Sequence, residues 1–190
     1  MIYYLIASIL IAVAALFART KRAVLAAGIL FYAWGGLYDT TSAAFFTFDA
    51  LGTLFYLLLV VVSMYVFGHS EAYLQGEDLR SYRLYFALLM LLTTAIAGAY
   101  FANNLAVTWI FLEATTLCSA GIIYHRRTAQ ALEAAWKYVF VCSTGIAMAY
   151  LGILLLAAAL PAAFPAEARE IIDINLSLIH ISEPTRPISI

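Results

Sequence analysis

The fold class of this chain is decided by one stretch, Leu105-Ala-Val-Thr-Trp-Ile-Phe-Leu-Glu-Ala-Thr-Thr-Leu-Cys-Ser-Ala-Gly-Ile-Ile-Tyr124. About 20 mainly apolar residues are enough to cross a bilayer core of about 30 Å as a helix. The single formal charge of the stretch, Glu113, lies near its middle. A charged residue there costs roughly 2.5–3.5 kcal/mol on insertion. We therefore expect Glu113 to face protein or water and to have a function.

The composition of the whole chain agrees with a membrane protein. Of its 190 residues, 65% are hydrophobic and 11% are charged, whereas a soluble domain has about 25% charged residues. The net charge of −1 offers no basic surface for nucleic acid, so no nucleic-acid partner is expected. The sequence has no glycine-rich phosphate loop, no Ser-His-Asp arrangement and no membrane histidine pair. We predict no cofactor and no metal site, and interpret Cys118 and Cys142 as packing residues.

Six apolar segments predict an all-α fold, a polytopic bundle of about six transmembrane helices. Helix is the expected state because backbone groups in lipid must be hydrogen-bonded internally. The first segment is interpreted as a retained span and not a secretory signal, since its charges follow the apolar run. The predicted spans are Ile2–Ala18, Ala23–Tyr38, Asp49–Phe67, Tyr82–Phe101, Leu105–Tyr124 and Leu132–Leu160.

Positive charge is concentrated in alternate connections. Lys and Arg occur in the first, third and fifth connections and are absent from the second (Asp39–Phe48) and fourth (Ala102–Asn104). The positive-inside rule then predicts odd connections in the cytoplasm and both termini on the outer, periplasmic side of the cell inner (cytoplasmic) membrane. The third connection, Gly68–Ser81, is expected to be a solvated loop. His69 and His125 are expected to be solvated in these cytoplasmic connections.

Two further features concern the ends of the predicted bundle. Asp49 opens the third span and is expected to cap it at the positive end of the helix dipole. Residues 1–160 are predicted to form the bundle and residues 161–175 a polar segment. The run from Leu176 to Ile190 resembles translated sequencing-adapter read-through, so residues 176–190 are expected to be non-native, and His180 is given no role.

Glu113 and Lys137 are the candidate proton-handling residues. At 1.5 Å per residue, Glu113 lies about 12 Å below the outer end of its span and Lys137 about 8 Å above the cytoplasmic edge. Their heights differ by about 10 Å in a core of about 30 Å, so a water chain or a third residue must link them. Thr116 shares a helix face with Glu113 and is a possible hydrogen-bond partner. The alternative for Glu113 is a permanently protonated carboxyl that bonds a neighbouring helix.

Lys137 has a second interpretation as well. Glu133 precedes it by four positions, which is the favourable order for an ion pair on a helix. Lys137 can also extend toward the cytoplasmic surface. It is therefore either a structural partner of Glu133 or a residue that holds a proton and modulates Glu113.

Two segments resemble a known family. They are Asn104–Ala120, with the wording Leu-Glu-Ala-Thr-Thr-Leu, and Leu132–Ala147, with Glu-Ala-Ala-Trp-Lys-Tyr. They are similar to the fifth and sixth helices of the antiporter-like subunits of respiratory complex I and membrane-bound [NiFe] hydrogenases (the NADH dehydrogenase subunit 5 or proton-conducting transporter family). The wording is most like the hydrogenase-4 component F branch. Phe48-Asp-Ala-Leu-Gly52 resembles the start of the family's third helix.

The resemblance implies a proton-translocating subunit of a redox-driven complex, with other membrane and hydrophilic subunits as partners. The family's proton-channel glutamate corresponds to Glu113, and the lysine of its sixth helix to Lys137. The family's main channel lysine lies on a broken helix beyond the sixth, which this sequence lacks, so an N-terminal fragment is expected. Two alternatives stay open: a subunit of a multisubunit Na⁺/H⁺ antiporter, and a structural membrane scaffold without transport.

Overall fold

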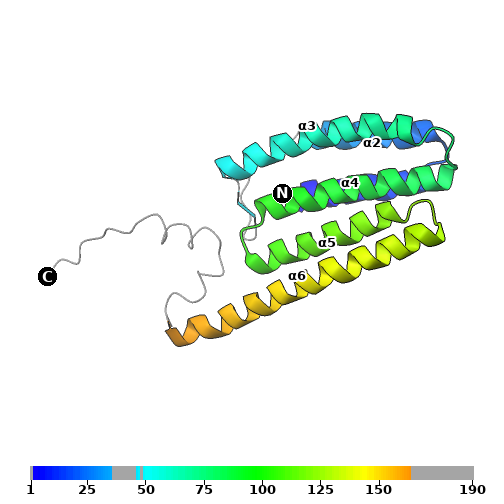
Figure 1. Ribbon diagram of the computed structural model, residues 1–190. Helices are drawn as coiled ribbons and strands as arrows, with labels where there is room; N and C mark the ends of the chain where they lie inside the picture. The colour runs from blue at the N-terminus through cyan, green and yellow to red at the C-terminus, as the bar shows by residue number, and fades with distance from the viewer. Residues whose placement is uncertain (1, 36–45, 48, 164–190) are drawn as a thin grey trace.

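The chain folds into long helices joined by short connections (Figure 1). The structure is a computed structural model that describes residues 2–35, 46–47 and 49–163. These ranges contain one isolated β-bridge, between Phe46 and Ala102, and no strand. The predicted all-α fold is therefore confirmed for the described residues. Its helices are α1 (Ile2–Phe17), α2 (Lys21–Gly35), α3 (Ala50–Tyr73), α4 (Leu79–Phe101), α5 (Leu105–Ile123) and α6 (Ala129–Ala163).

Four of these helices are long and apolar enough to cross a membrane: α3, α4, α5 and α6. Within the described residues, helices α1 and α2 have 16 and 15 residues, fewer than the roughly 20 that a full span needs. The described part of each of the six predicted segments forms a helix, and among the described residues length and composition support four of them as spans.

Helix α4 lies at the centre of the bundle. It packs on α1, α2, α3 and α5, whereas α6 packs on α5. In Figure 1 the layer of α2 and α3 lies on one side of α4 and the pair α5–α6 on the other. This order places α6 at one edge of the bundle, where it is joined to the rest through α5.

The third connection is shorter than predicted. Helix α3 continues through Gly68 and His69 to Tyr73, so the connection is 74–78 and not Gly68–Ser81. Gly76, with φ of 91°, supplies the left-handed backbone that a turn requires. Gly68 lies inside the helix, where glycine weakens but does not end it.

Helix α6 begins earlier and ends later than predicted. The hydroxyl of Thr128 accepts from the Ala131 backbone N–H at 3.1 Å, as an N-terminal cap does, so the helix starts at Ala129 and not at Leu132. It passes through Pro161 and ends at Ala163, inside the predicted polar segment 161–175. The predicted tail 176–190 lies outside the described residues.

Asp49 caps α3, as its sequence context predicts. Its Oδ1 accepts from the Gly52 backbone N–H at 3.0 Å. A Cβ on Gly52 would lie 2.5 Å from that same oxygen and 3.1 Å from the carbonyl oxygen of Tyr100. Glycine at this position therefore permits both the cap and the close approach of α3 to the end of α4.

The first, third and fifth connections meet at one end of the bundle. Lys21 donates to the carbonyl oxygen of Glu77 at 2.8 Å, and Arg83 donates to that of Ala18 at 3.0 Å. The Glu77 carboxylate pairs with Arg126 at 3.0 Å. Three basic residues at this end, Lys21, Arg83 and Arg126, are thus bonded to backbone or acid groups of a neighbouring segment. The membrane side on which this end lies stays a prediction.

Two buried apolar clusters hold the bundle together. The cluster at the connection end includes Phe31 of α2, Phe86 of α4, and Leu74, which directly follows α3. The cluster at the opposite end includes Tyr4 of α1 and Phe101 of α4. Neither cluster contains a residue of α6, so the attachment of α6 depends on its direct contacts with α5.

Candidate functional site

Glu113 is held halfway along α5. The helix starts at Leu105, and the side chain of the preceding Asn104 caps it by accepting from the Ala106 backbone N–H at 2.9 Å. Glu113 is the ninth of the 19 residues of α5. Its carboxylate therefore lies near the middle of the span, whether the depth is counted from the first or from the last residue of the helix. The side chain is half-buried, facing the seam between α5 and α6.

The partner of Glu113 is Ser143 on α6. The Ser143 hydroxyl donates to Glu113 Oε1 at 2.9 Å. A hydroxyl has one proton to donate and lone pairs to accept with. Ser143 can therefore pair with the carboxylate as a donor and, after rotation, with a protonated carboxyl as an acceptor. This contact suits a group that changes its protonation state.

The predicted contact between Thr116 and Glu113 is wrong. Thr116 is buried, and its hydroxyl donates to the Leu112 carbonyl at 3.2 Å, a bond that Thr commonly makes to its own helix. Sequence reasoning missed Ser143. The signal was the small polar run Ser143-Thr144-Gly145 inside the apolar α6.

Trp109 forms a second polar contact across the same seam. Its indole N–H donates to the Ile146 carbonyl at 2.8 Å. Its ring also lies 4.5 Å from that of Tyr150, centroid to centroid. Trp109 precedes Glu113 by one helical turn, and Ile146 follows Ser143 by nearly one. The two contacts together set the register of α5 against α6.

That register separates Lys137 from Glu113. Pairing Glu113 with Ser143 and Trp109 with Ile146 places Lys137 level with Ser119, near the connection end of α5. Ser143 follows Lys137 by six positions, about 9 Å along the axis and about 120° around it. The structure does not bring the two predicted residues together.

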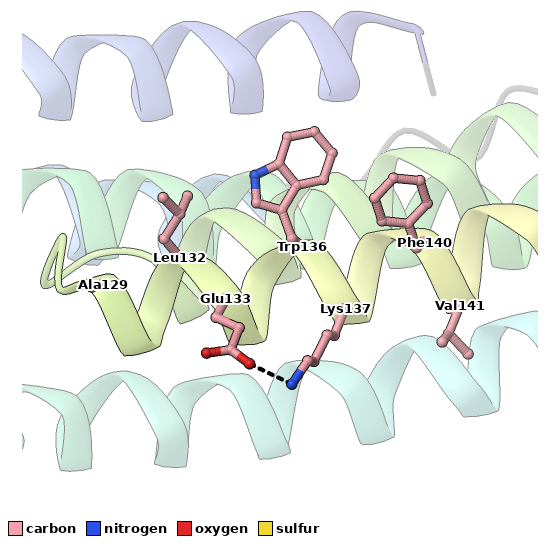
Figure 2. Close-up of a pocket in the computed structure, with 7 residues that line it drawn as sticks. All are labelled: Ala129, Leu132, Glu133, Trp136, Lys137, Phe140 and Val141. Carbon is pink, nitrogen blue, oxygen red and sulfur yellow. Dashed lines mark hydrogen bonds and ion pairs between the residues drawn. The ribbon is translucent and has the colours of Figure 1, made fainter.

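Lys137 instead pairs with Glu133. The ammonium Nζ lies 2.5 Å from Glu133 Oε1, and the two side chains are 74% and 66% exposed. Figure 2 shows this pair on α6, with Trp136 and Phe140 pointing to the other side of the helix. An open groove runs along this part of α6, lined by Ala129, Leu132, Glu133, Trp136, Lys137, Phe140 and Val141.

The two histidines of the predicted cytoplasmic connections differ in environment. His69 is exposed and stacks on Tyr65, but it belongs to α3. His125 is 6% exposed, so the prediction that it is solvated is wrong. The rings of Tyr73 of α3 and Tyr85 of α4 lie 6.3 Å and 5.3 Å from its imidazole. The sequence offers no sign of this burial, because the residues that follow His125 are arginines.

No metal site is visible within the described ranges. There, no three His, Cys, Asp or Glu side chains gather closely enough to hold an ion. Cys118 and Cys142 are free thiols, each half-buried.

The chain is similar to a curated hydrogenase component. The chain is 30% identical over 118 residues to the Hydrogenase-4 component F homolog of Methylacidiphilum infernorum (isolate V4), which covers 59% of this chain and 25% of that protein. The chain thus spans about a quarter of the length of the curated relative it matches. No family model and no solved structure matches it. The resemblance to hydrogenase-4 component F that the α5 and α6 motifs predict is confirmed.

Proposed function

We propose that this chain is the N-terminal part of a multi-pass, proton-translocating subunit of a hydrogenase-4-like membrane complex, and that Glu113 carries the proton. One observation supports this most: a mid-span carboxyl that faces a hydroxyl on the next helix, in a chain similar to a hydrogenase component. The other subunits of such a complex are the partners. The similarity favours this function over a subunit of a Na⁺/H⁺ antiporter.

The proposed step is a reversible proton transfer at Glu113. A water molecule donates a proton to the carboxylate, and the hydroxide left behind is reprotonated from the aqueous phase. The Ser143 hydroxyl then turns from donor to acceptor. Release of the proton reverses these events toward the opposite side of the membrane. A nearby positive charge favours the ionised carboxyl and its withdrawal favours the neutral one, which is how distant redox chemistry would drive the cycle.

The test is redox-driven proton transport by the full-length protein, assembled in its complex in sealed vesicles. Transport that depends on Glu113 supports the proposal. Transport that continues unchanged without a carboxyl at position 113 would overturn it and leave a structural role for this residue.

Ser143→Ala is expected to lower the transport rate by about tenfold, because hydrogen bonds to charged groups contribute roughly 1.5–3 kcal/mol. Ser143→Thr retains a hydroxyl and should recover most of the rate. Thr144→Ala is the matched control, because the Thr144 hydroxyl donates to the Phe140 carbonyl of its own helix. Equal rates for Ser143→Ala and Thr144→Ala would show that the hydroxyl does not assist Glu113.

We propose that Lys137 modulates Glu113 from a distance. Lys137→Ala should leave the stability almost unchanged, since an exposed i,i+4 ion pair contributes about 0.3–0.5 kcal/mol. We expect a partial loss of proton transport, smaller than the loss at Glu113, measured in the same vesicles. Native transport in this variant would assign the pair with Glu133 a structural role alone.

A further inference from the structure

A second groove, distinct from the one along the outside of α6, opens between the end of α5 and the start of α6. Its volume is about 330 Å³, within the range of about 300–1,000 Å³ that ligand pockets span. It is lined by Ala120, Gly121 and Tyr124 on the α5 side and by Leu132, Trp136 and Val139 on the α6 side. Gly121 lies eight residues beyond Glu113, about 12 Å along the helix axis. The groove is therefore separate from the Glu113 site.

The walls of this α5–α6 groove suit a slender apolar ligand. The α5 wall has small residues, Ala120 and Gly121, whereas the α6 wall carries the large side chains of Leu132 and Trp136. Figure 2 shows Leu132 and Trp136 on the same side of α6, away from the ion pair between Glu133 and Lys137. The Trp136 side chain is 56% exposed, so a ligand can reach its ring. An acyl chain has no polar groups to satisfy and fits such a groove.

An uncompensated cation lies where the two walls of the groove join. The connection from α5 to α6 contains two exposed arginines. Arg126 is paired with Glu77 at 3.0 Å, whereas Arg127 forms no ion pair within the described residues. The Arg127 backbone N–H donates to the Tyr124 carbonyl at 3.0 Å, and the next residue, Thr128, caps α6. Arg127 is thus held between the ends of both walls, with its charge available to a ligand.

The backbone of Arg127 is strained. Its φ is 54°, in the left-handed region that residues other than glycine adopt uncommonly. The neighbouring connection meets the same requirement with a glycine, Gly76 at φ 91°, which adopts this conformation without steric cost. Backbone strain of this kind is concentrated at ligand-binding and active sites, where the side chain is needed. The conformation of Arg127 is therefore a second indication that its side chain binds a ligand.

We propose that the α5–α6 groove binds one anionic phospholipid, with an acyl chain against Trp136 and the phosphate on Arg127. A guanidinium matches the geometry of a phosphate and can donate two hydrogen bonds to it. Tyrosine and tryptophan rings are typical of the headgroup depth of a membrane, where Tyr124 and Trp136 would lie. A zwitterionic lipid also carries a cationic group, which Arg127 repels, so the site selects an anionic lipid. This binding does not depend on the function proposed for Glu113.

The experiment is quenching of Trp136 fluorescence by brominated acyl chains. The full chain is placed in phosphatidylcholine bilayers that contain brominated phosphatidylglycerol or brominated phosphatidylcholine with the same chains. The variant Trp136→Phe supplies the background of the other two tryptophans. We expect the anionic lipid to quench Trp136 at an about fivefold lower mole fraction, the factor for one arginine beside an anionic headgroup. Equal quenching by the two lipids would overturn the proposal, and so would no quenching, because protein would then fill the groove.

The role of Arg127 is tested with three variants in the same bilayers. Arg127→Gly should lose the fivefold preference without loss of thermal stability, because glycine suits a positive φ. Arg127→Lys keeps the charge and should keep most of the preference. Arg22→Gln is the matched control, since Arg22 is an exposed arginine of α2, a helix that packs on α1, α3 and α4. A preference that persists in Arg127→Gly, or that Arg22→Gln lowers equally, would show only a general attraction and would exclude the site.

Discussion

Glu113→Gln is expected to abolish redox-driven proton transport and to leave the α5–α6 seam folded. The amide has nearly the shape of the carboxyl. In the native protein the Ser143 hydroxyl lies 2.9 Å from Glu113 Oε1, and the carbonyl oxygen of glutamine can accept the same hydrogen bond. The amide has no proton to release in the physiological pH range. The loss would therefore be chemical. Proton transport in sealed vesicles is the measurement, with assembly of the complex checked in parallel.

Two variants control for this result. Glu133→Gln removes a carboxylate from α6 that is 66% exposed and pairs only with Lys137 among the described residues, so it should retain most of the transport. Glu113→Asp keeps a titratable group but shortens its reach to Ser143, and an intermediate rate is expected. If Glu113→Gln and Glu133→Gln transport equally well, Glu113 is a structural residue that bonds one helix to another.

Gly98→Ala is expected to destabilise the bundle by about 1–3 kcal/mol, the usual effect of overpacking. A Cβ on Gly98 of α4 would lie 2.3 Å from the ring of Phe111 on α5. That ring is also packed against Phe46, at 6.0 Å between centroids, so its movement is opposed. Because Phe111 is two residues from Glu113, a displaced α5 should also lower proton transport. Thermal unfolding in detergent measures the first effect.

Gly152→Ala is the matched control for this packing prediction. No atom lies within 4 Å of a Cβ at Gly152, and alanine is favoured over glycine inside a helix by about 0.5–1 kcal/mol. This variant should be as stable as the native chain or slightly more stable. A stabilised Gly98→Ala would contradict close contact of α4 and α5 at this point.

The helices themselves follow from local sequence. Long apolar runs predict them because every backbone group in a bilayer must bond within its own segment, and the asparagine and aspartate caps at Asn104 and Asp49 are local signals too. The errors occur where two local signals compete. At the end of α3, Gly68 and Gly76 are both plausible breaks, and only Gly76 adopts positive φ.

One of the two residues of the candidate site, Glu113, could be predicted from the sequence. Glu113 is conspicuous because an acid in an apolar helix is energetically expensive. Its partner was not, because several polar residues lie within reach by sequence spacing alone. The contacts of Trp109 with Ile146 and of Glu113 with Ser143 depend on how α6 is rotated and shifted against α5. No property of either helix alone determines that shift.

The burial of His125 also could not be predicted from the sequence. Its neighbours Arg126 and Arg127 are charged, which favours solvent exposure, and the burial arises from helices that are distant in the sequence. Composition and periodicity by themselves establish an all-helical membrane chain, an unusual acid in mid-span and positive charge at alternate connections. The packing of α4 and α6 against α5 then selects Ser143 as the partner of Glu113 and leaves Lys137 on the outside. Rings from α3 and α4 lie against His125, which is buried. Helical periodicity specifies which side chains share a face, but it does not specify which neighbouring helix that face meets.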